Sequence, residues 1–168
     1  MRSSSPPAIA DGDRVRGEGP ADVIEYGDYE CPYCAQADLI LAGLPVRRAF
    51  RHFPVTSKHP RARVLASAVE AAALQGAFWE MHDALFADQG RLDDPHLWER
   101  VRRLDLDLDR FEADRRSEAV AARVGQDFRS GVAAGVMSTP TLFVDGAAHP
   151  GVPGEELIAL LRAAAPRC

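Results

Sequence analysis

The hydrophobic positions near the start of the chain form short β-branched and aromatic runs on either side of a helical pattern. Residues 23–26 predict one strand and residues 48–55 predict a second. Between them, a helix is expected to begin after Cys31 and to end near Gly43. Strand, helix and strand in this order predict a βαβ unit that carries two cysteines at the start of its helix.

From residue 61 to residue 135, apolar residues recur every three or four positions, which predicts a block of helices. Asp94 followed by Pro95 is a start signal for one of them. The alternation of leucine and aspartate at residues 106–109 fits either a short strand or a helix-capping turn, and the turn is the preferred interpretation. The aromatic residues of the block have helical spacing and are expected in the core rather than in a substrate groove: Phe78, Trp79, Phe86 and Trp98.

The end of the chain returns to the strand pattern. Residues 141–144 predict a strand, residues 145–146 (Asp-Gly) predict a tight turn, and residues 147–149 predict a returning strand. A last helix is expected from Gly154, with apolar residues that can lie on the sheet. The pattern as a whole predicts an α/β fold in which helices interrupt a sheet.

The first twenty residues lack such a pattern and are rich in serine, proline, glycine and charge. A segment of this composition buries too little apolar surface to offset the entropy of ordering, so a flexible tail is expected. The predicted organisation is a tail at 1–20, a βαβ half at 21–60, a helical insertion at 61–135 and a ββα half at 136–168.

The length, net charge and hydropathy of the chain narrow the classes of function that it can have. With 168 residues the chain is long enough to bury a core without disulfides. Its net charge of −5 argues against nucleic acid as a partner. No apolar run approaches the roughly 20 residues that span a bilayer, and Met1 to Pro20 lack the core of a signal peptide. A cytoplasmic location is expected for the chain as written, although an exported mature form or a domain of a longer protein would have the same sequence.

The spacing of Cys31 and Cys34 points to thiol chemistry. The thiolate is the reactive form of cysteine, and Pro32 after Cys31 is typical of a first helical position, where free N–H groups and the helix dipole stabilise an anion. The pKa of Cys31 is therefore expected to fall, which makes it the nucleophile. Cys34, one turn further into the helix, is expected to be the more buried, resolving thiol.

Two other readings of the cysteine pair are weaker. Zinc needs about four ligands, and the five histidines are scattered without a second cysteine pair, so no metal is expected. A structural disulfide across so short a loop would constrain the unfolded chain little. Cys168, the third cysteine, is expected to be an inert chain end. His52 and His59 flank the loop after the second strand, and an approach to the cysteines is the less favoured interpretation for both.

Three acids lie close to the pair in sequence. Asp28 and Glu30 would oppose the Cys31 thiolate if their charges came close to it. Glu25 interrupts an apolar strand, and two positions for it remain open. It is either a buried carboxyl that accepts the Cys34 proton, directly or through water, or a residue at a strand edge that reaches solvent.

Two motifs together resemble the DsbA-like branch of the thioredoxin family. Residues 23–34 read VIEYGDYECPYC and, after the helical block, residues 135–146 read GVMSTPTLFVDG. The resemblance extends from about Ala21 to the final helix, and it implies a thioredoxin-like fold with a helical insertion. The Pro32-Tyr33 pair between the cysteines is similar to that of glutaredoxins and departs from the best-known DsbA, but the long separation of Cys34 from Pro140 leaves room for the insertion.

The resemblance also implies the site and the activity. Thr139 and Pro140 would form a cis-proline loop against the active disulfide, and the backbone of Thr139 would pair with an extended substrate, with Pro32 and Tyr33 alongside. Glu25 falls where the family has its buried acid. No cofactor is expected beyond the Cys31–Cys34 disulfide, and the expected partners are protein or peptide thiols and disulfides, with glutathione or a thioredoxin-type protein as redox partner.

Thiol–disulfide exchange is therefore the predicted function, with its direction open. A glutathione-binding transferase or isomerase related to the kappa class is an alternative, although that class usually lacks a second active-site cysteine. A non-catalytic peptide-binding module on the same fold is another.

Overall fold

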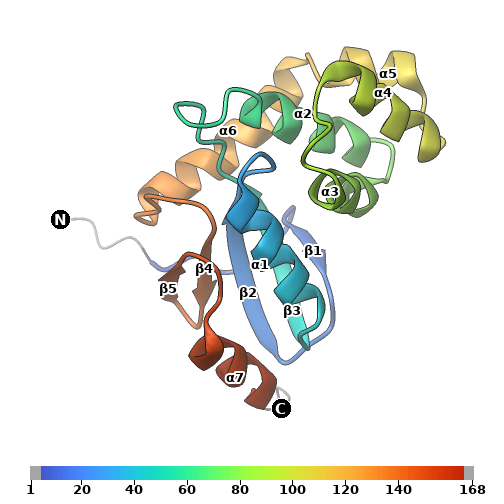
Figure 1. The fold of residues 1–168 in the computed structure, drawn as a ribbon. Coiled ribbons are helices and arrows are strands. Elements are labelled where there is room, and N and C mark those ends of the chain that lie inside the picture. The colour runs from blue at the N-terminus through green and yellow to red at the C-terminus, as the bar shows by residue number, and fades with distance from the viewer. Residues whose placement is uncertain (1–4, 165–168) are drawn as a thin grey trace.

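The computed structural model describes residues 5–164 and places them around a five-stranded sheet (Figure 1). The strands lie in the order β1-β3-β2-β4-β5, and of the neighbouring pairs β2 and β3 are parallel and the others antiparallel. Their bounds are β1 Arg14–Arg16, β2 Ala21–Gly27, β3 Val46–His52, β4 Thr141–Val144 and β5 Ala147–Pro150. The α/β class and the thioredoxin-like arrangement predicted from the sequence are confirmed.

The predicted βαβ unit is β2, α1 (Pro32–Ala42) and β3. α1 begins directly after Cys31 and ends at Gly43, as the sequence predicts. β3 begins and ends earlier than the predicted 48–55, because the chain turns away from the sheet after His52.

The helical insertion shares a core with the sheet. It consists of α2 Ala62–Ala73, α3 Phe78–Ala87, α4 Asp94–Arg103, α5 Leu108–Asp114 and α6 Glu118–Ala133. Phe78 and Phe86 are buried in one cluster with Phe50 of the sheet, and Trp79 packs at its border. The carboxylate of Asp107 accepts the N–H of Arg110, which confirms a capping turn at 106–109.

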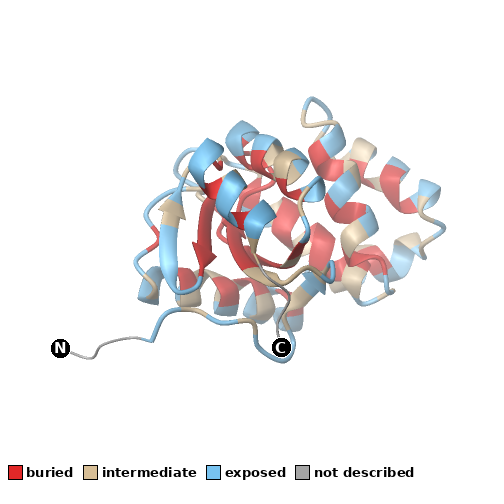
Figure 2. Cartoon of the chain, turned by 90° about the horizontal axis from the view of Figure 1, so that it is seen from below, coloured by how far each residue is buried: buried red, intermediate tan, exposed pale blue. Residues whose placement is uncertain are grey.

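The end of the chain follows the predicted pattern of strand, turn, strand and helix. β4 and β5 form a hairpin whose turn residues Asp145 and Gly146 both have positive φ. The last helix, α7 (Glu155–Ala163), packs with α1 in one core cluster, whereas Phe128 of α6 packs in another with Ile24 and Tyr26 of β2. Figure 2 shows that buried residues concentrate in the sheet and on the inner sides of the helices.

The prediction of a flexible tail at residues 1–20 is wrong for residues 5–20, the part that the structure describes. β1 pairs with β3, and Ile9 packs on the sheet cluster that contains Tyr26. Arg51 of β3 donates to the carbonyl of Ala8 at 2.9 Å and to the carboxylate of Asp13 at 2.8 and 2.9 Å. The segment is held by partners supplied by the rest of the chain, which its own composition does not reveal. Residues 1–4 lie outside the described part.

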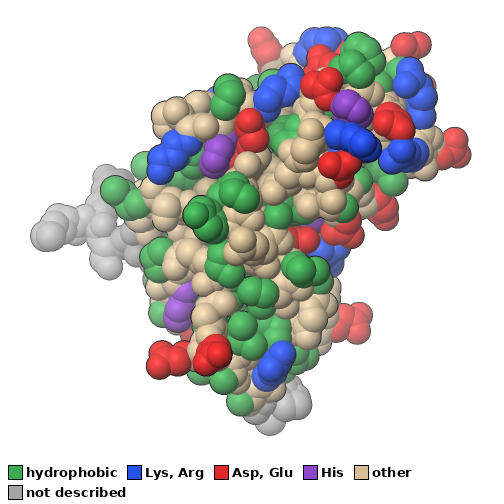
Figure 3. All heavy atoms as spheres, viewed as in Figure 1, with side chains coloured by type: hydrophobic (Ala, Val, Ile, Leu, Met, Phe, Trp, Pro, Cys, Tyr) green, Lys and Arg blue, Asp and Glu red, His purple; other side chains and the backbone are tan. Residues whose placement is uncertain are grey.

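Charged side chains are unevenly distributed over the surface. In Figure 3 they gather over the helical insertion, whereas the surface near α1 is mostly hydrophobic or uncharged. Asp38 is the one charged residue of α1, and it is largely buried. None of the described helices is both long enough and apolar enough to cross a membrane.

The ordered N-terminal segment leads to a stability prediction. Asp13→Ala leaves the largely buried guanidinium of Arg51 without its carboxylate, so the free energy of unfolding is expected to fall by about 3 kcal/mol. Asp11→Ala, at a neighbouring exposed position, is the matched control and is expected to change it by less than about 0.5 kcal/mol. Urea unfolding of both variants checks the prediction, and equal midpoints would contradict it.

Candidate active site

Cys31 occupies the position that its sequence context predicts. It is the N-cap of α1, with Pro32 at the first helical position, and its backbone N–H donates to the carbonyl of Asp28 at 3.1 Å. Both cysteines are present as free thiols and are buried, with Cys31 only 3% exposed and Cys34 fully enclosed. Only a small part of Cys31 is therefore accessible to a partner.

The site strongly favours the thiolate of Cys31. A hydrogen bond from the Cys34 thiol is the main cause that lowers the pKa of Cys31 to about 6, and the backbone N–H groups of Cys34 and Tyr33 and a contact with Thr139 add to it. Burial opposes the shift and does not cancel it. Cys31 is therefore mostly ionised at neutral pH.

Cys34 is shifted in the opposite direction. Burial raises the pKa of Cys34 well above its usual range, and its hydrogen bond to Cys31 and the charge of Glu25 raise it further. The N–H of Asp28 donates to the Cys34 sulfur at 3.4 Å and partly offsets these effects. The pair thus combines a reactive thiolate with a protonated thiol, as the sequence predicts.

The proline loop lies against the nucleophile. The Thr139–Pro140 bond is cis, and the Cys31 thiol contacts the carbonyl oxygen of Thr139 at 3.5 Å. Two large apolar side chains near this contact are exposed, Tyr33 by 59% and Met137 by 91%. The structure therefore brings together both motifs that carry the family resemblance, with Tyr33 open to a partner.

Glu25 is buried, which decides between the two positions left open by the sequence. One of its oxygens accepts two N–H groups of Arg48, at 2.7 and 3.0 Å. The other oxygen, Oε1, has no hydrogen-bond partner among the described residues. Burial raises the pKa of Glu25, although the charge of Arg48 acts against this.

Arg48 connects Glu25 to a buried polar network that the sequence analysis missed. Arg48 also donates to Asp38 at 2.6 Å, and Nε2 of His82 lies 2.9 Å from the same oxygen of Asp38. Hydrogen bonds from His82 and Arg48 outweigh burial and lower the pKa of Asp38 to about 2. Burial lowers the pKa of His82 to about 4, so its ring is neutral: Nε2 donates to Asp38, and Nδ1 accepts from the hydroxyl of Tyr29 at 2.8 Å.

One signal for this network was present in the sequence. Arg48 is a charged residue inside a strand that a parallel sheet would bury, as Glu25 is. In the register of β2 and β3, Glu25 is opposite Phe50, so Arg48 is its diagonal neighbour on the same side of the sheet. His82, on α3, carries no such signal, because its partners are distant in sequence.

The carboxylates of Asp28 and Glu30 accept hydrogen bonds from N–H groups. The Asp28 carboxylate accepts from the backbone of Glu30 and of Val55, both at 2.9 Å, and lies 2.8 Å from Nδ1 of His59. The Glu30 carboxylate accepts the N–H of Arg61 at the start of α2, at 2.8 Å. Both acids therefore serve to fix the loop before Cys31.

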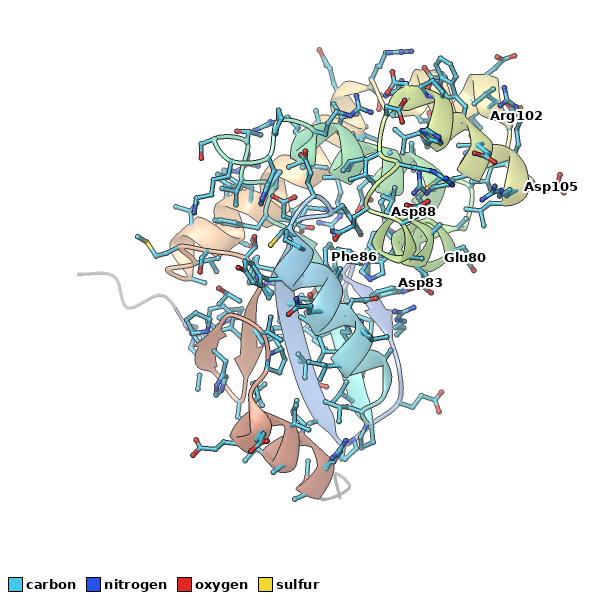
Figure 4. The ribbon with its side chains drawn as sticks, in the orientation of Figure 1. Glu80, Asp83, Phe86, Asp88, Arg102 and Asp105 are labelled. Atoms are coloured by element: carbon cyan, nitrogen blue, oxygen red, sulfur yellow. The ribbon has the colours of Figure 1, made fainter. Side chains whose placement is uncertain are left out.

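The other sequence candidates fall outside the site. His52 is buried, and its Nε2 lies 2.8 Å from a carboxylate oxygen of Glu70. It is not among the residues that contact the sulfurs of Cys31 and Cys34 in the described interactions. Cys168 lies outside the described residues. Asp83, labelled on α3 in Figure 4, forms with Asp38 and His82 a group that could hold a cation. However, Arg16 donates to Asp83 at 2.9 Å and Arg48 donates to Asp38 at 2.6 Å. Two guanidinium groups thus already neutralise these carboxylates.

Comparison with known proteins agrees with this geometry. A family model described as thioredoxin matches residues 10–161. The chain belongs to this thioredoxin family. A thioredoxin-like oxidoreductase from Silicibacter pomeroyi has 27% identity and a TM-score of 0.80, over 90% of this chain and 91% of that one. BdbD from Bacillus subtilis has 22% identity and a TM-score of 0.77, over 94% of each chain. The thioredoxin-like fold thus carries the Cys31–Cys34 pair at the start of α1.

The curated relatives of this thioredoxin-family chain are much longer proteins. It is 48% identical to the Na⁺/H⁺ antiporter NhaA 1 of Salinispora arenicola over 155 residues, which are 86% of this chain and 23% of the antiporter. It is 42% identical to the antiporter NhaA of Herminiimonas arsenicoxydans over 149 residues, 84% of this chain and 24% of that protein. The chain spans about a quarter of the length of these relatives.

The low pKa of Cys31 can be tested by titration. Thiolate absorbance near 240 nm and the rate of alkylation are expected to reach half their maximum near pH 6 and to fall about tenfold per pH unit below it. Cys34→Ala removes the main hydrogen-bond donor and is expected to raise this midpoint by at least one unit, whereas Cys34→Ser retains a hydroxyl donor and is the matched control. A wild-type midpoint near 8.5 would refute the assignment.

Proposed function

We propose that this protein exchanges disulfides with protein or peptide substrates through Cys31 and Cys34. The observation that carries the proposal is the opposite shift of the two pKa values, because it prepares one sulfur to attack and keeps the other protonated until it is needed. The two alternative functions do not require this arrangement: glutathione conjugation needs no second thiol, and a peptide-binding module needs no shift in the pKa of either cysteine.

The proposed reaction has two steps. The Cys31 thiolate attacks one sulfur of a substrate disulfide, the substrate S–S bond breaks, and the other substrate sulfur leaves as a thiolate. Cys34 then loses its proton and attacks Cys31, which releases the second substrate sulfur as a thiolate. The substrate gains two electrons and the cysteine pair becomes a disulfide. Substrate oxidation is the same sequence in reverse.

Glu25 is the proposed acceptor of the Cys34 proton. Its charge is close enough to raise the pKa of Cys34, and Oε1 is free of other described partners. The raised pKa of Glu25 makes it a better base than an ordinary carboxylate, while Arg48 holds the opposite oxygen in place.

Substrates are proposed to bind as extended segments across the proline loop. The backbone of Thr139 is positioned beside the Cys31 sulfur, and pairing with a substrate strand there would align a substrate sulfur with the thiolate. Exposed Tyr33 and Met137 suit apolar residues near the substrate cysteine. In a reducing compartment the pair would reduce or rearrange disulfides, with glutathione or a thioredoxin-type protein restoring the dithiol, whereas in an oxidising compartment it would oxidise substrate thiols.

Cysteine substitutions test the activity. Cys31→Ser is expected to abolish reduction of a disulfide-linked peptide, because no thiolate of low pKa remains. Cys34→Ser is expected to accumulate the Cys31–substrate mixed disulfide, detectable by mass spectrometry. Exchange that survives Cys31→Ser would refute the proposal, and peptide binding without exchange in the wild-type protein would favour a binding module.

The role of Glu25 has its own test. Glu25→Gln keeps the shape of the side chain but cannot accept the proton, so release of substrate from the mixed disulfide at pH 7 is expected to slow about 100-fold. Glu70→Gln changes a buried, paired carboxylate elsewhere in the core and is the matched control, with a rate close to wild type. Equal rates for Glu25→Gln and wild type would exclude Glu25 as the proton acceptor.

A further inference from the structure

The main chain of Asp28 contacts both active-site cysteines. Its N–H donates to the Cys34 sulfur at 3.4 Å, and its carbonyl accepts the N–H of Cys31 at 3.1 Å. A small rotation of this one residue would therefore change the surroundings of both sulfurs. What fixes Asp28 bears directly on how the pair reacts.

The Asp28 side chain is fixed by three donors. The carboxylate is fully buried and accepts the backbone N–H groups of Glu30 and Val55. The third donor, His59 through Nδ1, is the one that a side chain provides among the described residues. A buried carboxylate that loses a donor is left with an unsatisfied oxygen, so it would reorient to recover a partner.

His59 is built into its position. The N–H groups of Lys58 and His59 both donate to the carbonyl of Val55, at 3.0 and 2.9 Å, and the resulting turn brings the imidazole back to Asp28. The ring is 21% exposed, so it lies at the edge of the site rather than within the core. His59 has no contact with either sulfur among the described interactions, so any effect on the cysteines passes through Asp28.

We propose that His59 is a positioning residue for the resolving step: by holding the Asp28 carboxylate, it keeps the Asp28 N–H on the Cys34 sulfur. This inference rests on the proposed disulfide exchange and adds to it a residue that does not touch the reacting atoms.

The attack by Cys34 depends on the hydrogen bond from the Asp28 N–H more than the earlier attack by Cys31 does. As Cys34 gives up its proton and attacks the Cys31 sulfur of a mixed disulfide, negative charge develops on Cys34 before the new S–S bond forms and the substrate thiolate leaves. An N–H donor stabilises a charged acceptor more than a neutral one, so the Asp28 N–H favours this step. Cys31 is already ionised when it attacks, and its own stabilisation comes mainly from Cys34 and the start of α1.

The test separates the two steps. Reduced protein is mixed with oxidised glutathione, quenched with acid at intervals, and the mixed disulfide and the intramolecular disulfide are quantified by mass spectrometry. His59→Leu is expected to form the mixed disulfide at the wild-type rate but to convert it about tenfold more slowly, so that this intermediate accumulates. His59→Asn places an amide N–H near the position of Nδ1 and is expected to restore the conversion rate.

His96→Leu is the matched control. His96 also contacts an aspartate, Asp93, but this pair lies at the start of α4 on the surface, and its loss is expected to leave both steps unchanged. The proposal is overturned if His59→Leu converts the mixed disulfide at the wild-type rate, if both steps slow equally, or if His59→Asn is as slow as His59→Leu.

A second variant covers the case in which His59→Leu fails to fold. Asp28→Asn removes the buried charge from the other side of the contact and is expected to delay the second step in the same way, whereas a wild-type rate would overturn the proposal. Failure of the proposed function is distinguishable, because the wild-type protein itself would then form no mixed disulfide with glutathione.

Discussion

The hydrogen bond between the two active-site sulfurs is the interaction on which the rest of the site depends. The Cys34 thiol stabilises the Cys31 thiolate, and the same contact makes Cys34 harder to ionise. The opposite shifts of the two pKa values therefore give two residues of the same type different roles. The helix start, the proline loop and the main chain of Asp28 hold the sulfurs where this hydrogen bond is possible.

The polar network beneath the cysteines places charge in the core without leaving it uncompensated. Glu25 and Asp38 approach the same guanidinium from two sides, and His82 completes the hydrogen bonding of Asp38. Buried ions are tolerated when paired in this way, because each partner replaces part of the lost hydration. Among the described residues, two atoms of this network lack a hydrogen-bond partner, Nη1 of Arg48 and Oε1 of Glu25, and the carboxylate oxygen is the one that is free to take up a proton during the reaction.

Features that follow from local sequence were predictable, and those that need distant partners were not. Short sequence motifs predict the start of α1 at Pro32 and the β4–β5 turn, and the family resemblance predicts the proline loop. Arg48 was missed because its role appears only when two strands are set in register. The N-terminal segment was misjudged for the same reason: its stabilising partner, Arg51, lies in β3 and leaves no trace in the composition of the first twenty residues.

The loop before Cys31 is fastened to the helical insertion as well as to the sheet. Gln89, which follows α3, donates to the carbonyls of Tyr29 and Cys31 at 2.8 and 3.0 Å, and Glu30 caps the start of α2. These attachments lie at the end of the insertion nearest the cysteines, whereas α4 and α5 have no such contact among the described interactions. A displacement of α3 or of the start of α2 would therefore move the loop that carries the sulfurs directly, whereas a displacement of α4 or α5 would reach the sulfurs only through the packed core between them.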